Sequence, residues 1–210
     1  LSMPLEQATA VVNNGYIYSI GGTNGTTDQT TVRYALLCTS YNYGQGGCTG
    51  RPGTLGTWSS TSVLRLGLEQ ATAQVNNGYV YVMGGSNAGT AQSTVYYALL
   101  CTGTNSGVGG CGSTPGTIGT WSTTSSWISV GGATALAGAA SVVNNNYIYE
   151  IGGSSSPSCS GSNTNTVYYA PINSNGTLGS WASTAGMVYG RYGSVAEAWG
   201  GYVYNNGGTT

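Results

Sequence analysis

A short pattern occurs four times in this chain of 210 residues. "NNGYIYSIGG" occupies residues 13–22, "NNGYVYVMGG" residues 76–85, "NNNYIYEIGG" residues 144–153 and "GGYVYNNGG" residues 200–208. A recurring pattern constrains the fold more than any single motif does. Each copy forms one supersecondary unit, and it must bury its apolar face against a neighbouring unit. The chain is therefore expected to be an array of similar units.

Further landmarks extend each unit. The segments "TVRYALL", "TVYYALL" and "TVYYAPI" follow the first three glycine pairs, and a third segment ends at Trp58, Trp121 and Trp181 as "GTLGTW", "GTIGTW" and "GTLGSW". Matching landmarks recur about every 60 residues. They divide the chain into units of residues 1–58, 59–121 and 122–181, followed by the first two strands of a fourth unit in residues 182–210.

Each complete unit is predicted to form four short antiparallel strands. Only 4% of the residues are charged, and tyrosine, valine, threonine and isoleucine are common, which favours strands over helices. The Asn-Gly pairs provide the positive φ angles of a two-residue hairpin turn. "YIYSI" alternates with a period of two, so one side of this strand should be buried. The predicted fold class is all-β, and repeated four-stranded antiparallel sheets are typical of β-propeller blades.

The order of the landmarks resembles the kelch repeat, a motif of β-propeller blades. An apolar strand ends at a glycine pair, a tyrosine follows twelve residues later, as Tyr34 follows Gly22, and a tryptophan closes the unit. The resemblance covers essentially the whole chain, although these units are longer than usual kelch blades and lack the charges often found near the tyrosine and tryptophan. It implies a kelch-like β-propeller, with about three and a half blades in this chain. The loop sequences, of the form "YALLC…C…PGTLGTW", are similar to those of secreted or surface-displayed microbial kelch-like proteins.

In such a fold the repeated residues are expected to serve packing. Glycine lets neighbouring blades approach, and each tyrosine or tryptophan ring between blades buries about 150–250 Å². Propellers close with roughly four to eight blades, so three and a half cannot complete a ring. We expect the remaining blades to lie outside these 210 residues, and the alternative is that a second chain supplies them.

Two cysteine pairs occupy matching places in the first two units. Cys38 and Cys48, like Cys101 and Cys111, lie between the "YALL" segment and the tryptophan-bearing segment. This correspondence predicts disulfides Cys38–Cys48 and Cys101–Cys111, each stabilising the fold by about 2–3 kcal/mol. Metal binding is disfavoured because the spacing is unsuitable and the chain has no histidine. Disulfides imply an oxidising compartment, so an extracellular or cell-surface location is expected.

Three more residues are candidates for covalent modification. Cys159 of the third unit is unpaired in the predicted scheme: it pairs outside this chain, bonds between subunits, or stays free. Asn24 and Asn175 each begin an Asn-Gly-Thr triplet, which fits the N-glycosylation sequon. Asn24 lies in an expected loop and is the better candidate, since Asn175 is needed for a tight turn.

The chain offers little for catalysis. Without histidine or lysine it cannot form Ser-His or Cys-His pairs, histidine metal ligands or Schiff bases, which excludes the copper site of galactose-oxidase-like kelch enzymes. Glu6 and Glu69 hold equivalent positions at the start of the innermost strands, so they should lie close together around the channel. A capping or channel-lining role is favoured over a glycosidase pair. We predict no catalytic residue, no cofactor and no metal site.

Charge and hydropathy narrow the class of partner. The formal net charge is -1 and the four arginines are scattered, which disfavours nucleic acid as a partner. No apolar run approaches the roughly 20 residues that a membrane helix needs, so insertion into a membrane is not expected. The favoured function is a non-catalytic extracellular binding or adhesion module whose rim loops contact protein or glycan. Tyr41 and Tyr43 are the candidate contact residues, unless they cover their own disulfide loop. A subunit of an extracellular filament or surface layer, assembled from copies of the chain, is the second hypothesis, and a glycan hydrolase is the third.

Overall fold

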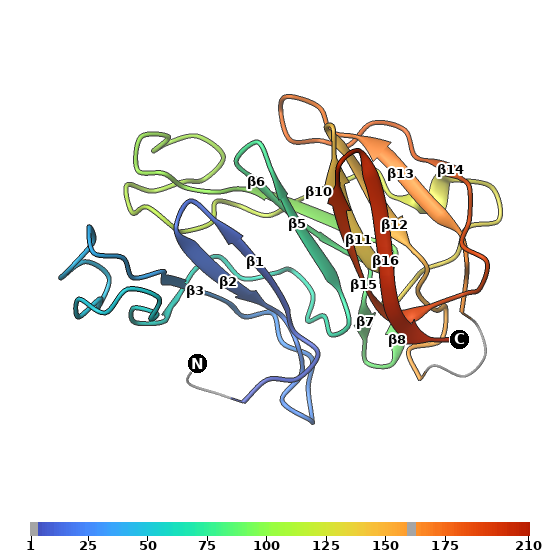
Figure 1. Cartoon of the computed structure of the whole chain (residues 1–210), viewed down its shortest axis with the longest axis horizontal. Coiled ribbons are helices and arrows are strands. Elements are labelled where there is room, and N and C mark those ends of the chain that lie inside the picture. The colour runs from blue at the N-terminus through green and yellow to red at the C-terminus, as the bar shows by residue number, and fades with distance from the viewer. Residues whose placement is uncertain (1–3, 159–162) are drawn as a thin grey trace.

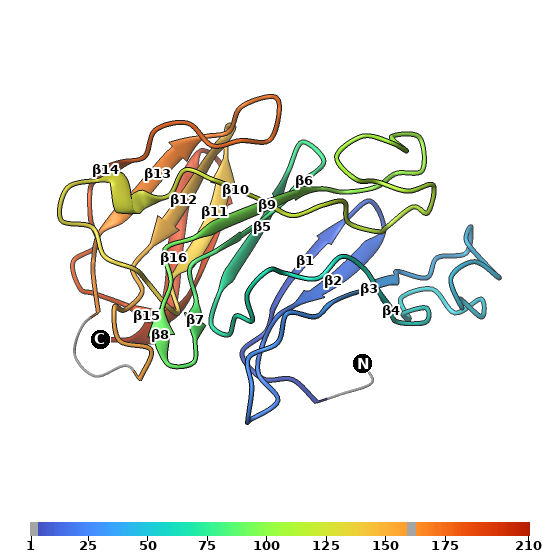
Figure 2. The same cartoon turned by 180° about the vertical axis from the view of Figure 1, so that it is seen from behind.

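The computed structural model describes residues 4–158 and 163–210, and the fold is all-β (Figures 1 and 2). The only helix in these two ranges is the 3₁₀ turn η1 (Trp127–Ser129). None of the described segments is a helix that is long and apolar enough to cross a membrane.

Three antiparallel sheets of four strands follow one another along the chain, as the sequence predicts. The first sheet contains β1 (Thr9–Asn13), β2 (Tyr16–Ile20), β3 (Val32–Leu36) and β4 (Ser59–Ser60). The second sheet contains β5 (Thr72–Asn76), β6 (Tyr79–Met83), β9 (Val95–Leu99) and β10 (Ser122–Thr124). The third sheet contains β11 (Ala140–Asn144), β12 (Tyr147–Ile151), β13 (Val167–Pro171) and β14 (Ala182–Thr184).

Two further pairs of strands complete the structure. The terminal hairpin contains β15 (Tyr192–Trp199) and β16 (Tyr202–Thr209) and corresponds to the inner two strands of a complete sheet. A small hairpin of β7 (Ser86–Asn87) and β8 (Thr90–Ala91) projects from the loop between β6 and β9.

The sheets end slightly later than the predicted units. Each fourth strand begins at the residue after the tryptophan, so β4, β10 and β14 lie beyond the predicted boundaries at 58, 121 and 181. The tryptophan side chains of the second and third units are buried against the preceding sheet. Each lies between an isolated bridge to its own sheet (Leu100 with Ile118, Ile172 with Leu178) and the start of the fourth strand. The predicted tryptophan-bearing strand is therefore corrected to a strand that follows the tryptophan.

The repeated Asn-Gly turns have the predicted conformation. Asn14 and Gly15 connect β1 to β2 with φ angles of 48° and 79°, and Asn77 and Gly78 repeat this geometry in the second sheet. The third turn has asparagine at both positions, and this is tolerated because asparagine adopts the left-handed region more readily than most residues.

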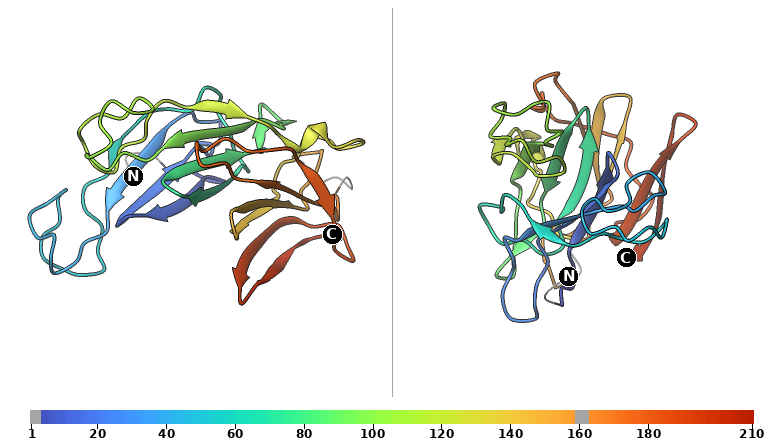
Figure 3. Two further views of the ribbon diagram at one scale, coloured as in Figure 1. Left: turned by 90° about the horizontal axis from the view of Figure 1, so that it is seen from above. Right: turned by 90° about the vertical axis from the view of Figure 1, so that its left-hand side faces the viewer.

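The sheets fan out from a row of inner strands, β1, β5, β11 and β15, which lie side by side in chain order (Figure 3). Backbone hydrogen bonds between equivalent residues join this row. The Gln70 amide donates to the Gln7 carbonyl over 3.0 Å, Gly138 donates to Gln70 over 2.9 Å, and Gly193 donates to Gly138 over 2.7 Å. The same joint thus recurs at each step and sets a constant relation between neighbouring sheets.

The glycine pairs form a second joint between sheets. The second glycine of each pair donates its amide to a carbonyl of the next unit: Gly22 to Leu68 over 2.7 Å, and Gly85 to Leu136 over 2.9 Å. A Cβ atom on Gly84 would lie 2.5 Å from the Leu136 carbonyl oxygen. A side chain there would push the sheets apart, which confirms the packing role predicted for these glycines.

Aromatic rings fill the seams between the sheets, also as predicted. Tyr18 and Trp121 are buried in the cluster that joins the first and second sheets. Tyr81 and Trp181 are buried in the cluster that joins the second and third, where the Tyr81 hydroxyl donates to the Gly176 carbonyl over 2.9 Å. Trp58 is only half-buried because no described sheet precedes the first one.

Candidate binding surfaces on the two rims

The loops gather on two opposite rims of the fan. The disulfide rim consists of the Asn-Gly turns and the segments 37–57 and 100–120, which are held together by bonds such as that from the Leu37 amide to the Gly15 carbonyl (2.7 Å). The glycine rim consists of segments 21–31 and 84–94, which follow the glycine pairs. This separation follows from the alternating directions of the antiparallel strands.

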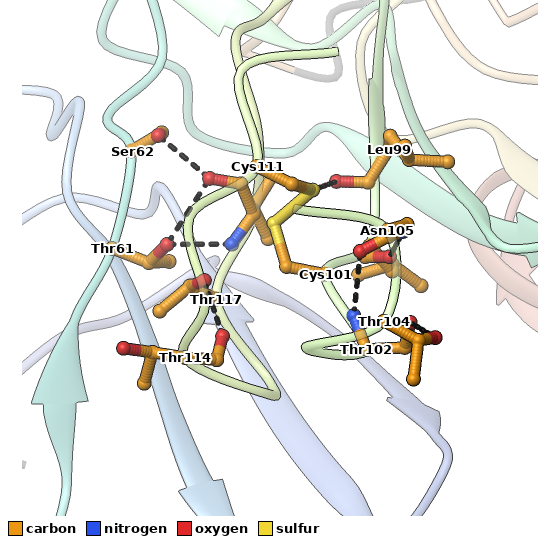
Figure 4. The surroundings of a disulfide bond; sticks show 12 residues. Thr61, Ser62, Leu99, Cys101, Thr102, Thr104, Asn105, Cys111, Thr114 and Thr117 are labelled. Atoms are coloured by element: carbon orange, nitrogen blue, oxygen red, sulfur yellow. Dashed lines mark hydrogen bonds between the residues drawn. A yellow bond between two sulfur atoms is a disulfide. The ribbon is translucent and has the colours of Figure 1, made fainter. Parts of the chain in front are cut away.

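Both predicted disulfides are present on the disulfide rim. The sulfur atoms of Cys38 and Cys48 lie 2.06 Å apart, and the Cys101–Cys111 bond closes the matching loop of the second sheet (Figure 4). All four cysteines are buried. Because the Cα separations are 5.4 and 5.3 Å, each loop closes at an ordinary disulfide distance.

An asparagine braces each disulfide loop, and the sequence analysis did not identify it. Asn105 accepts a hydrogen bond from the Thr102 amide over 3.0 Å and donates to the Leu100 carbonyl over 3.0 Å (Figure 4). Asn42 makes the same two bonds in the first loop. The signal was the shared spacing Cys-Thr-x-x-Asn, which places the amide side chain back over the start of the loop.

The candidate binding tyrosines differ in their surroundings. Tyr43 is exposed, but its ring lies over Gly50 of the same loop, where a Cβ atom would approach the ring to 2.6 Å. Tyr41 exposes 95% of its surface at the tip of the loop. Tyr43 therefore lies against the backbone of its own loop, and Tyr41 is the more exposed of the two rings.

A cleft of about 410 Å³ lies on the disulfide rim between the first and second sheets. Tyr16 and Tyr34 lie in its wall with ring centroids 5.9 Å apart, and Pro115 contributes from the second unit. Burial, with a smaller contribution from Tyr16, raises the pKa of Tyr34. The cleft combines apolar ring faces with hydroxyl groups, a combination suited to sugar rings or peptide side chains.

A larger cavity of about 610 Å³ lies on the glycine rim. Glu6 and Glu69 both line it, as their predicted proximity requires, and Asp28 joins them from the first glycine-rim loop. Burial, and then the negative charges of Asp28 and Glu6, raise the pKa of Glu69. Asp28 accepts a hydrogen bond from the Ala88 amide over 2.7 Å and so ties the two loops together. In the part of the chain that the structure describes, no cluster of three histidine, cysteine or acidic residues is arranged to hold a metal ion.

The two sequon asparagines are exposed. Asn175 accepts hydrogen bonds from the amide and hydroxyl of Thr177 and so closes the short turn that replaces the disulfide loop in the third sheet. Asn24 accepts bonds from the Thr26 and Thr27 amides on the glycine rim. Their glycosylation stays a prediction, and Cys159 lies outside the described residues.

Comparison with known proteins gives a likeness of fold. No family model and no curated protein matches the chain. The solved structure of YjhT is similar, with a TM-score of 0.66 and 19% sequence identity, over 98% of this chain and 59% of YjhT. The chain therefore spans about three fifths of the length of YjhT. At this identity the likeness concerns the fold alone.

Proposed function

We propose that this chain forms three and a half blades of a kelch-like β-propeller and acts outside the cell as a non-catalytic binding or adhesion module. Three like sheets around a common row of inner strands support the architecture, together with the glycines and aromatic rings at each seam. The two disulfides support an oxidising environment.

The observation that carries the binding role is the tyrosine-lined cleft on the disulfide rim, with the exposed Tyr41 on the adjacent loop. The sheets and the disulfides hold these loops rigidly, so little conformational entropy is lost when a ligand binds. Aromatic faces beside hydroxyl groups suit the rings of a glycan or the side chains of a protein. We therefore propose glycans or extracellular proteins as the partners.

A binding screen against a glycan array and a panel of extracellular proteins tests this role. We expect selective binding by the native chain, which Tyr41→Ala weakens about three- to tenfold because one stacking contact is lost. Tyr189→Ala is the matched control, since Tyr189 is also exposed but lies outside both disulfide loops. Absence of selective binding, or equal losses in both variants, would contradict the proposal.

The same screen tests the hydrolase hypothesis. Glu6 and Glu69 share a cavity, and the raised pKa of Glu69 is a property expected of a general acid. Analysis of the incubated glycans for released products separates binding from turnover. If the native chain forms products and the Glu69→Gln variant does not, the chain is an enzyme and the binding-module proposal is wrong.

Exposed apolar residues at both ends of the fan favour a second candidate function, that of a subunit in an extracellular filament or surface layer. Leu55 and Val63 are exposed in the segments before and after β4, and Trp199 and Tyr202 are exposed on the terminal hairpin. Large exposed apolar surfaces usually mark interfaces. Native mass spectrometry would show an open series of oligomers for a filament subunit, whereas a monomer at all concentrations would exclude this role.

A further inference from the structure

The cleft on the disulfide rim, which carries the proposed binding role, is lined entirely by uncharged residues. Its volume of about 410 Å³ lies within the range of small-molecule sites, roughly 300–1,000 Å³. A ligand with a carboxylate or an ammonium group would lose part of the hydration of that charge here and would gain no partner of opposite charge, which is unfavourable. The cleft therefore favours a neutral ligand.

Two tyrosine rings form a corner in this cleft. The ring centroids of Tyr16 on β2 and Tyr34 on β3 lie 5.9 Å apart, and the ring planes are inclined at 55°. The buried Tyr18 stacks against Tyr34 with a centroid distance of 6.4 Å. Gly116 of the second unit lies against the other ring, since a Cβ atom on it would approach Tyr16 to 2.5 Å. Both rings are thus held in place before a ligand binds, which lowers the entropic cost of binding.

Polar side chains that are available to a ligand line the same cleft. Gln45 and Ser59 come from the first unit and Thr114 comes from the second. Within residues 4–158 and 163–210, no hydrogen bond engages any of these three side chains. The backbone of Gln45 is nevertheless fixed, because its amide donates to the Asn42 carbonyl over 3.1 Å and its carbonyl accepts from the Cys48 amide over 2.8 Å. The cleft therefore offers neutral hydrogen-bonding groups on an ordered loop.

Neutral sugars match both parts of this surface. A pyranose ring has a face of C–H groups that packs on an aromatic ring, and its hydroxyl groups donate and accept hydrogen bonds with amide and hydroxyl side chains. Proteins match it less well, because about a quarter of the residues of an ordinary protein are charged and the cleft offers no partner for them.

We propose that this cleft binds an uncharged glycan, with a sugar ring in the corner of Tyr16 and Tyr34 and its hydroxyl groups hydrogen-bonded to Gln45, Ser59 and Thr114. This assignment rests on the proposed binding function and restricts the partner to neutral carbohydrate.

The seam between the second and third sheets provides a control within the same chain. Tyr79 and Tyr97 repeat the ring pair with a centroid distance of 6.1 Å. Val108 holds the place of Gln45 in the second disulfide loop, and both residues are exposed. The two loops are closed by disulfides of the same spacing, so these positions are equivalent. The second seam therefore has the rings but has valine in place of the amide.

A glycan array that contains neutral and acidic glycans tests the proposal with the full chain. We expect the bound glycans to be neutral. In calorimetric titrations, an analogue of the best ligand with one ring oxidised to a uronic acid should bind at least about tenfold more weakly, because its carboxylate gains no partner. The affinity for the neutral glycan should be the same at low and high salt, since no ion pair forms.

Two pairs of variants locate the site. Gln45→Ala should weaken binding of the neutral glycan about three- to tenfold through the loss of a hydrogen bond, whereas Val108→Ala should leave the affinity unchanged. Tyr34→Phe removes a hydroxyl group from the cleft and should also weaken binding, with Tyr97→Phe as its control. Circular dichroism checks that all four variants fold.

The outcomes separate this proposal from the function on which it rests. If acidic glycans or proteins bind and neutral glycans do not, the chain is a binding module but the assignment to neutral carbohydrate is wrong. The assignment is also wrong if Gln45→Ala has no larger effect than Val108→Ala, because the glycan then binds elsewhere. If neither a glycan nor a protein binds selectively, the proposed binding function itself fails.

Discussion

Glu150 is the most unusual residue of the structure. It lies on β12, exposes 1% of its surface, and neither carboxyl oxygen has a hydrogen-bond partner. Ser141 and Tyr168 are directly opposite on the neighbouring strands, but Gln74 and Thr72 already engage the Ser141 hydroxyl. Burial alone raises the pKa of Glu150 well above its ordinary value. Burial therefore favours the neutral form of this acid within the fold.

Glu150 should make the chain less stable as the pH rises. Below about pH 4.3 the carboxyl is protonated in both the folded and the unfolded state, so it adds no pH dependence there. Above that value the unfolded chain releases the proton while the folded chain keeps it, and the free energy of unfolding falls by about 1.4 kcal/mol per pH unit up to the raised pKa. Urea unfolding between pH 4 and pH 9 should show this slope, and Glu150→Val, which copies Val82 of the second sheet, should remove it.

Glu197→Gln is the control, because Glu197 is exposed on the terminal hairpin. An unchanged slope in Glu150→Val would show that the carboxyl does not control the pH dependence.

The segments that precede the fourth strands show how the place of a sheet in the row changes the burial of equivalent residues. Leu55, Ile118 and Leu178 occupy the same place, and the letters around Leu55 and Leu178 are nearly identical. Ile118 and Leu178 expose 3% and 5% of their surfaces, whereas Leu55 exposes 41%. Each buried residue packs against the preceding sheet, and the first sheet has no such neighbour among the described residues.

Truncation of these residues measures the contribution of the seam. Leu178→Ala should lower the free energy of unfolding by about 2–4 kcal/mol, because it leaves a cavity in a buried cluster. Leu55→Ala shortens a side chain that is already exposed to solvent, and it should lower the free energy of unfolding by less than about 1 kcal/mol. Chemical unfolding of both variants gives the comparison, and equal losses would mean that Leu55 is also covered in solution.

At the scale of the whole molecule, the structure is a row of sheets in which each sheet contacts mainly its neighbours. The bonds from Gln70 to Gln7 and from Gly85 to Leu136 belong to two joints that recur along the row and repeat one geometric step. Stability in such arrays is nearly a sum of the terms for each unit and each seam. Among the described residues, the first sheet and the terminal hairpin each contact a neighbouring sheet on one side only.

Much of this architecture could be predicted from the sequence because it depends on short-range physics. The Asn-Gly turns need positive φ angles, the alternating strands need one buried side, and the cysteines of each pair lie close enough along the chain to close one loop. These requirements are met within a few residues, so a repeated pattern was sufficient to identify the turns, the strands and the disulfides.

Other properties were decided only by the tertiary structure. The sequence does not show that Leu55 is exposed while Leu178 is buried, that Asp28 shares a cavity with Glu6 and Glu69, or that Glu150 is enclosed without a partner. Each depends on which sheet or loop from another unit lies in front of the residue. Local sequence determined the shape of each sheet, whereas the stacking of the sheets determined which side chains are exposed to water.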